Sequence, residues 1–412
     1  MEHKKIYPWI VVALLWFVAL LNYMDRQMLS VMRESMMIDI VALERAANFG
    51  RLMSIFLWIY GMMSPFMGSI ADRVNRKWLI VCSLFIWSAV TLLMGLCTTF
   101  DQLYVLRAIM GASEAAYIPA ALALIADYHK DKTRSLAIGI HMTGLYVGQA
   151  MGGFGVTIAA TFSWQHTFFS LGFIGILYSI ILIYVLKEKR IVLAADNNTK
   201  RSLKDEIISV FLGLKLLLVN ISFWIILLYF ATPSLPGWAT KNWLPTLFAD
   251  SLHISMEQAG PLSTIAMAVA SFVGVILGGI LSDRWVLKNM RGRIYTGAIG
   301  LSLMIPALLL LGFGNTLLEI VSGAIFFGVG FGIFDANNMP ILCQFVAPRY
   351  RATGYGLMNM TGVLAGAFIT GYLGQSTDTG HLGNHIGLLS VGIVVVLILQ
   401  LAYLRPTTID KN

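Results

Sequence analysis

Long runs of apolar residues, separated by short polar segments, recur along the whole chain. Most of these runs reach the ~20 residues that an α-helix needs to cross a ~30 Å hydrocarbon core. The first run is one of many similar ones, so we do not interpret it as a removable signal peptide. The pattern predicts an all-α integral membrane protein with twelve spans, at Trp9–Met37, Phe49–Ile70, Trp78–Cys97, Leu103–Ala126, Leu136–Ala160, Phe168–Leu186, Val219–Phe248, Ala259–Leu281, Ile294–Phe313, Leu318–Phe334, Gly354–Leu373 and Ile386–Leu404.

A long polar stretch divides these spans into two sets of six. Residues 187–215 carry many charges that a membrane cannot accommodate. We therefore predict an N-terminal six-helix bundle at residues 1–190, a cytoplasmic linker at 191–218 and a C-terminal six-helix bundle at 219–412.

The two halves also repeat a motif. Gly68–Lys77 (GSIADRVNRK) follows the second span, and Gly279–Arg284 (GILSDR) follows the eighth. Secondary transporters are often built from such repeats, with the substrate site near the midplane between them, because rocking of one half exposes the site to each side in turn. The repeat predicts two pseudo-symmetric bundles around a central site.

Composition and charge agree with a membrane protein. Hydrophobic residues make up 58% of the chain and charged residues only 12%, whereas a soluble domain has about 25% charged residues. Most of the 29 Lys and Arg residues lie in segments that a cytoplasmic N-terminus places inside the cell. The net charge of +8 therefore reflects membrane topology rather than nucleic-acid binding, and it predicts a plasma membrane location, in a bacterium the inner membrane, with both termini cytoplasmic. Three cysteines without metal-type spacing indicate no metal site, and we expect no cofactor.

Four ionisable residues lie inside predicted spans: Asp25 and Arg26 in the first, and Arg107 and Glu114 in the fourth. A charge at bilayer depth costs at least about 2.5–3.5 kcal/mol and is kept mainly where it faces a cavity, a partner or a substrate. Arg107 and Glu114 are two helical turns apart and project from nearly the same face. The four charges sum to zero, so we expect mutual pairing. The cluster is either a transport site or a structural lock between the two spans.

A site of this kind can couple an anion to a proton. Arginine offers a planar fork of donors that suits a carboxylate ligand. A substrate anion that binds the arginine releases a neighbouring carboxylate, which can then take up a proton. These residue types predict that binding of an organic anion and of a proton is coupled.

At this level the chain resembles the major facilitator superfamily, through GSIADRVNRK and its weaker copy. The resemblance covers essentially the whole chain and implies that Asp72, Arg73 and Arg76 belong to a cytoplasmic gate. The alternative is a basic loop that only sets the topology.

More local motifs are similar to those of the anion:cation symporters, which carry sugar acids and other organic anions with protons or sodium. They are NYMDR at residues 22–26, RxxxGxxEAxxxPA at 107–120, WLPT at 243–246 and SMEQAG at 255–260. The resemblance implies that Arg26 binds the substrate carboxylate. It makes Asp25 and Glu114 protonation sites, with Arg107 tuning Glu114.

The same resemblance implies a sugar-binding surface. Tyr23 and Tyr60, in the first two spans, would contact polyol hydroxyls, and Asn359 in the eleventh span would close the site from the C-terminal half. Outside the resemblance, tyrosines in spans often serve as interfacial anchors.

Two features of the sequence leave the cargo and the role of Lys241 open. NYMDR and RxxxGxxEA also resemble the spinster-like lipid transporters, which would share the site residues but not the cargo. Lys241 departs from the family pattern, near Pro233 and Pro236, where a broken helix would present it to the cavity. In the cavity, Lys241 would bind a second anionic group of the substrate. The alternative is that its side chain snorkels to the outer interface. Asp335 receives no role.

The leading hypothesis is a monomeric secondary transporter that performs proton-coupled symport of an organic anion, such as a hexuronate or an aldonate, by alternating access. The alternative is a spinster-like transporter of lysolipids or other amphiphiles. An enzyme is disfavoured because HExxH and GxGD protease motifs are missing from the sequence.

Overall fold

The computed structural model describes residues 3–129, 133–188, 218–219, 221–347 and 351–406, without the side chains of residues 3–5, 69, 72, 73, 135 and 352. Within these ranges the protein is helical and has no β-strand, as the sequence predicts. The first half contains α1 (His3–Val31), α2 (Arg33–Met37), the 3₁₀ helix η1 (Val41–Glu44), α3 (Ala46–Arg73), α4 (Arg76–Met94), α5 (Phe100–Glu114), α6 (Tyr117–Tyr128), α7 (Arg134–Gly152), α8 (Gly155–Thr161) and α9 (Trp164–Val185). The second half contains α11 (Ile221–Leu252), α12 (Met256–Val286), α13 (Gly292–Phe313), α14 (Leu317–Phe345), α15 (Arg351–Asp378) and α16 (Leu382–Tyr403).

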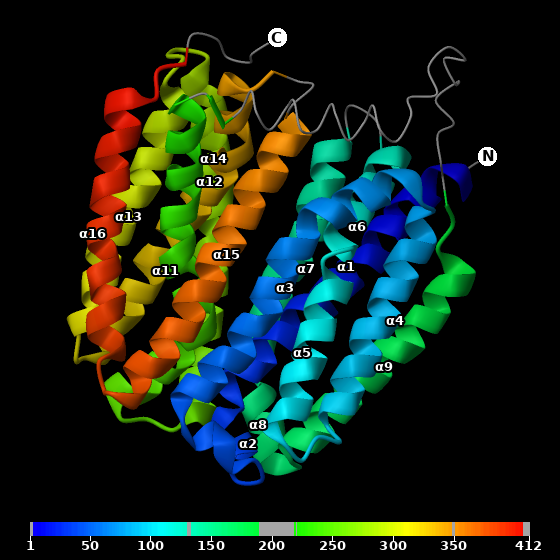
Figure 1. Ribbon diagram of the computed structural model, residues 1–412. Helices are drawn as coiled ribbons and strands as arrows, with labels where there is room; N and C mark the ends of the chain where they lie inside the picture. The colour runs from blue at the N-terminus through cyan, green and yellow to red at the C-terminus, as the bar shows by residue number, and fades with distance from the viewer. Residues whose placement is uncertain (1–2, 130–132, 189–217, 220, 348–350, 407–412) are drawn as a thin grey trace.

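The helices of the first half lie side by side on one side of the molecule, and those of the second half lie on the other (Figure 1). Both termini lie at one end, which we call the terminal end; α1 and α15 finish at the opposite end, the far end (Figure 1). The predicted linker at 191–218 lies outside the described residues, apart from its last residue. The domain boundaries therefore stay a prediction.

Ten helical segments of the described chain are long and apolar enough to span a membrane. The prediction of twelve spans is thus confirmed for ten. The other two correspond to α3 and to α7 with α8, which run beside the spanning helices in the first half (Figure 1).

Several helix boundaries differ from the sequence prediction. The predicted span Trp9–Met37 ends at Val31, and Leu103–Ala126 consists of α5 and α6, which are separated at Ala115 and Ala116. In the second half, α11 runs without interruption through Pro233, Pro236 and Pro245. The expected break near Lys241 is therefore wrong, because neighbouring helices in a membrane bundle satisfy the backbone groups that proline frees.

Small residues set the distance between α1 and α7. A Cβ atom added to Gly144 would lie 2.6 Å from the carbonyl oxygen of Trp16, and one added to Gly148 would lie 2.2 Å from that of Leu20. Lipid removes most of the hydrophobic drive for helix association, so close backbone contact between small residues replaces it. The glycine face of α7 therefore holds α1, and with it Asp25 and Arg26, in a fixed position.

The two halves meet closely at the far end. A Cβ atom on Gly374 of α15 would lie 2.6 Å from the carbonyl oxygen of Ala46 in α3. One on Gly153, beside α8, would lie 2.8 Å from the carbonyl oxygen of Gly260 in α12. These contacts leave no room for side chains, so the halves are closed against each other here.

Asp378 joins the halves across this closure. Its carboxylate accepts hydrogen bonds from the backbone nitrogens of Ala46, at 2.6 Å, and Ala47, at 2.9 Å. The Arg45 side chain provides no cap for α3, so an acid from the other half satisfies its first amides and its dipole. Burial lowers the pKa of the nearby Arg33 guanidinium, and the carboxylates of Asp378, Asp250 and Glu34 oppose this shift.

At the terminal end the same pairs of helices are further apart. Cβ atoms added to Gly68 of α3, Gly139 of α7, Gly279 of α12 and Gly356 of α15 would meet no described atom within 4 Å. Because α3 and α15, and likewise α7 and α12, touch at the far end, the halves diverge towards the terminal end. The conformation is closed at the far end and open towards the termini.

Replacing Asp378 by Asn should therefore loosen the far end. Loss of a charged helix cap costs about 1 kcal/mol, so the far-end-open population should rise about fivefold. The measurement is labelling of Ser54→Cys, which lies against Gly371 in the α3–α15 interface, by an impermeant thiol reagent in a background without Cys82, Cys97 and Cys343. Asp101→Asn, an exposed acid in the first turn of α5, is the control. Equal labelling of the two variants would contradict a gating role for Asp378.

Candidate functional site

An ion pair joins α1 to the end of α5. The Nε atom of Arg26 lies 2.6 Å from Oε2 of Glu114, and Nδ2 of Asn22 donates to the same oxygen at 2.7 Å. The Glu114 side chain is completely buried, whereas that of Arg26 is 11% exposed. The spans that carry these charges thus meet, as the sequence predicts, and only the arginine is open to a ligand.

Aromatic rings surround the Arg26 guanidinium. Its Cζ atom lies 5.1 Å from the ring centre of Tyr23, 4.7 Å from that of Phe56 and 4.8 Å from that of Tyr60. Its Nη2 atom is buried and has no hydrogen-bond partner among the described residues. Rings stabilise the cation without occupying its donors, which leaves one nitrogen available for an acceptor. Both tyrosines of the predicted site lie beside this arginine.

Asp25 points away from this pair. Adjacent residues on a helix project about 100° apart, and the Asp25 carboxylate accepts a hydrogen bond from Thr91 of α4 at 2.5 Å. Only 2% of the residue is exposed. Asp25 therefore packs inside the first bundle rather than facing the space between the halves.

Arg107 makes a different set of contacts from those predicted. Its Cζ atom lies 4.6 Å from the ring centre of Phe56, and one guanidinium nitrogen lies 3.1 Å from the sulfur of Met110. Among the described residues it forms no ion pair within 4 Å with Asp25 or Glu114. The expected four-charge network is thus wrong in this detail: one direct pair is present, and the other two charges interact at longer range.

Asn359 connects the two halves beside the site. Its amide nitrogen donates to the hydroxyl of Ser64 at 3.1 Å, from α15 to α3. Ser64 is four residues from Tyr60 on α3, so both side chains occupy the same helix face. The contact agrees with the predicted position of Asn359 at the C-terminal side of the site.

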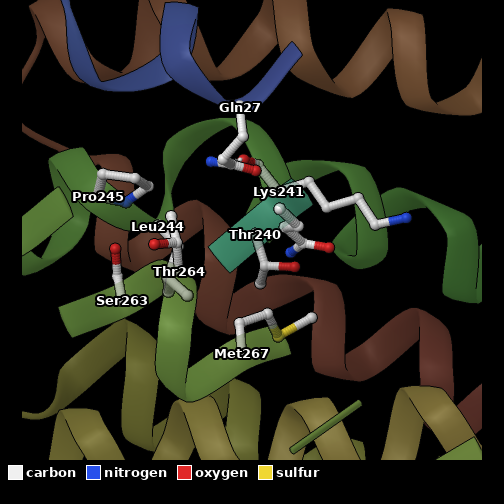
Figure 2. Close-up of a pocket in the computed structure, with 9 residues that line it drawn as sticks. Gln27, Thr240, Lys241, Leu244, Pro245, Ser263, Thr264 and Met267 are labelled. Atoms are coloured by element: carbon white, nitrogen blue, oxygen red, sulfur yellow. Dashed lines mark hydrogen bonds between the residues drawn. The ribbon is translucent and has the colours of Figure 1, made fainter. Parts of the chain in front are cut away.

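A small polar space lies between α1, α7, α11 and α12. It is lined by Gln27, Gln149, Thr240, Lys241, Leu244, Pro245, Ser263, Thr264 and Met267. Figure 2 shows Gln27 directed at the Lys241 backbone, whose carbonyl accepts its hydrogen bond at 3.0 Å. Gln27 and Gln149 are not among the residues predicted for the site, although uncharged amides inside spans were a visible signal.

The Lys241 side chain lies among aromatic rings of both halves. Its Nζ atom is 5.9 Å from the ring centre of Tyr23, 4.9 Å from that of Trp238 and 5.4 Å from that of Phe331. These rings belong to α1, α11 and α14. Lys241 therefore faces the interior between the halves, and the alternative in which it snorkels to the outer interface is wrong.

Part of the predicted gate lies outside the described side chains. Nothing is described for the side chains of Asp72 and Arg73. Arg76 pairs with Asp127, which links α4 to α6 within the first half. In this conformation Arg76 thus stabilises one bundle and makes no described contact with the other.

Fold and site together define a class of protein: a multi-pass α-helical transporter with charged groups between two bundles. The sequence matches the model of the Major Facilitator Superfamily over residues 15–370. The chain belongs to this superfamily, which confirms the resemblance found in its motifs.

Two similar proteins align with most of this chain. The chain is 27% identical to the probable galactarate/D-glucarate transporter GudP of Escherichia coli over 96% of its length and 92% of the relative's. It is 28% identical to protein spinster homolog 1 of Xenopus tropicalis, over 88% of the chain and 71% of the relative.

A solved structure shares the fold. The crystal structure of a bacterial homologue of the human lysosomal transporter Spinster, inward-facing and unoccupied, superposes with a TM-score of 0.77. It is 20% identical and covers 96% of each chain. Both resemblances seen in the sequence, to sugar-acid transporters and to spinster-like transporters, are therefore reproduced.

Proposed function

We propose that this transporter performs proton-coupled symport of an organic anion, with a sugar acid such as a hexuronate or an aldonate as its cargo. The observation that carries the proposal is the free Nη2 of Arg26, beside a buried carboxylate on one side and two tyrosines on the other. An organic acid with hydroxyl groups matches these three elements, because it brings a carboxylate for the guanidinium and hydroxyls for the phenols.

Coupling follows from competition for Arg26. In the empty site Glu114 and Arg26 neutralise each other at 2.6 Å. A substrate carboxylate that takes the guanidinium leaves Glu114 buried beside a second negative charge. Burial and a like charge both favour the neutral acid, so Glu114 takes up a proton together with the substrate. Release of the anion restores the ion pair and expels the proton.

Asp25 and Arg107 support this exchange from inside the first bundle. Asp25 is held by Thr91 and has one buried oxygen without a partner among the described residues. It is a second protonation site, screened from the substrate. Arg107 lies beside Phe56 in the same bundle and tunes Glu114 through its positive charge. Sodium in place of the proton is the alternative coupling ion.

Alternating access completes the cycle. The terminal end is cytoplasmic, in a bacterial plasma membrane, so the present conformation faces inward. Opening of the far end requires the Asp378 and Gly374 contacts between α3 and α15 to break, while Asn359 and Ser64 lie between the site and the terminal end. Asp72, Arg73 and Arg76 gate the cytoplasmic side, and one chain works as a monomer.

Transport of lysolipids is the second candidate, because spinster-like proteins share fold and motifs with this chain. The polar lining by Gln27, Gln149 and Thr240 disfavours it. An acyl chain gains nothing from buried amides, which lose hydrogen bonds to water when an apolar group covers them.

Uptake into proteoliposomes tests the proposal. With the interior alkaline, the purified protein should accumulate a labelled hexuronate or aldonate, and collapse of the pH gradient should abolish accumulation. A sodium gradient at equal pH on both sides is the comparison. Accumulation that ignores the proton gradient would overturn proton coupling, and uptake of lysolipid but not of sugar acids would favour the second candidate.

A further inference from the structure

A second pair of opposite charges lies in the C-terminal half. Lys241 of α11 and Asp335 of α14 interact electrostatically but form no ion pair within 4 Å in the described part of the chain. The Asp335 carboxylate accepts a hydrogen bond from Asn338 at 3.2 Å. The pair is the counterpart of Arg26 and Glu114 in the first half, and the proposed coupling of one carboxylate to one proton does not use it.

Tyr23 is close to both cations. Its ring centre is 5.1 Å from Cζ of Arg26 and 5.9 Å from Nζ of Lys241. Because both distances end at the same ring, the cations are separated by at most the sum, about 11 Å. A substrate that rests on Tyr23 is therefore within reach of a cation from each half.

This spacing sets the size of a ligand that uses both cations. A charge-assisted hydrogen bond takes up about 3 Å at each end, which leaves at most roughly 5 Å between the two anionic groups. At ~1.5 Å per bond this is about three bonds in a straight line, so a four-carbon chain covers the distance when extended and a six-carbon chain covers it when bent. A short-chain dicarboxylate fits, whereas a monocarboxylate of the same length leaves one cation without an anion.

Asp335 explains how Lys241 remains in the interior without substrate. Phe331 and Asp335 are four residues apart on α14, so they share a helix face, and the Phe331 ring is 5.4 Å from Nζ of Lys241. Asn338 donates a hydrogen bond to Asp335, and Lys241 and the four tyrosines Tyr23, Tyr146, Tyr229 and Tyr355 interact electrostatically with it. The carboxylate balances the lysine charge when the site is empty and competes with an incoming anion for it.

We propose that Lys241 and its counter-ion Asp335 form a second recognition site, so that the cargo carries two anionic groups, one for each half of the transporter. The inference rests on the proposed role of Arg26 and narrows the sugar acid to a dicarboxylate. A ligand of this kind bridges the halves, because its ends bind to different bundles.

Two six-carbon acids form the test: galactarate, with a carboxylate at each end, and galactonate, with one. Binding to the purified full-length protein is measured by calorimetry at fixed pH and ionic strength. Galactarate should bind at least about tenfold more tightly, as one additional charge-assisted contact gives. Lys241→Gln should remove this preference and change galactonate binding less than about threefold.

Three further variants separate charge from packing. Lys241→Arg should restore the preference, because it keeps the cation. Asp335→Asn removes the competing anion and should strengthen galactarate binding. Lys288→Gln, an exposed cation beyond the end of α12, should leave both affinities unchanged.

The outcomes distinguish the two proposals. If the unaltered protein binds both acids equally well, or if Lys241→Gln weakens both equally, the second recognition site is wrong while the proposed function stands. If it binds neither acid and no hexuronate either, the proposed function itself fails.

Discussion

Arg26→Lys should abolish measurable binding and uptake of the sugar acid. Lysine provides a point charge in place of the planar fork, and its shorter reach leaves Glu114 buried without its partner. Breaking a buried pair costs about 3–5 kcal/mol, and each ~1.4 kcal/mol is tenfold in affinity. We therefore expect a loss of at least about a hundredfold, measured as equilibrium binding and as initial uptake rate in proteoliposomes.

The control for this variant is Arg51→Lys. Arg51 also lies over two aromatic rings of the first half, those of Phe100 and Tyr104, each with a centre 5.8 Å away, but it forms no ion pair in the described chain. It should keep its transport rate. If Arg26→Lys binds the acid as tightly as the unaltered protein, Arg26 is not the anion ligand and the proposed mechanism is wrong.

Glu114→Gln should uncouple transport from the proton gradient. The glutamine carbonyl can still accept from Asn22 and Arg26, so the site keeps its shape, but it can neither release nor take up a proton. Accumulation driven by pH should disappear, while exchange of labelled for unlabelled substrate at equal pH should fall no more than about tenfold, as expected when a charged hydrogen bond becomes neutral. Both are measured in the same vesicles.

Two other variants complete the comparison. Glu257→Gln, an exposed acid in the first turn of α12, should retain proton-driven accumulation. Asp25→Asn tests the second proposed protonation site, and a loss of accumulation there would show that both carboxylates participate. Proton-driven accumulation by Glu114→Gln at the normal rate would exclude Glu114 as the coupling group.

The pairing of Arg26 with Glu114 was predictable from the sequence, because an unpaired charge inside a membrane costs free energy. Arg26 and Glu114 occur inside long apolar runs, where an unpaired charge is expensive, so their pairing followed from their presence in two spans. The spans were equally visible, because bilayer thickness fixes their length. Helix ends were less certain: the break after Glu114 occurs in an alanine-rich segment with no proline or glycine at positions 115 and 116.

Rotation of each helix about its axis was not available from the sequence. Asp25 and Arg26 are neighbours in the chain, yet Asp25 turns to Thr91 of α4 and Arg26 turns to Glu114 and to the rings of α3. Arg107 and Glu114 share a face but not a partner, because Glu114 sits at the end of α5 and Arg107 lies beside Phe56. Only tertiary packing decides such directions.

Uncharged polar residues in the spans could not be assigned to the site from the sequence alone. Gln27 and Gln149 line the space between the halves, but amides within spans commonly make hydrogen bonds between helices that have no other role. The sequence assigns no role to Asp335, because its relation to Lys241 depends on how α11 packs against α14. The structure places Asp335 on the same face of α14 as Phe331, whose ring lies beside Lys241.

The cap that Asp378 gives to α3 has a consequence for the energetics of the transport cycle. When the far end opens, the first turn of α3 loses its acceptor, and two amides turn to water or fray. Hydrogen exchange at Ala46 and Ala47 would then report on how often the far end is open. The start of one helix is thus completed only in one state of the cycle, and local unfolding there becomes part of the conformational equilibrium.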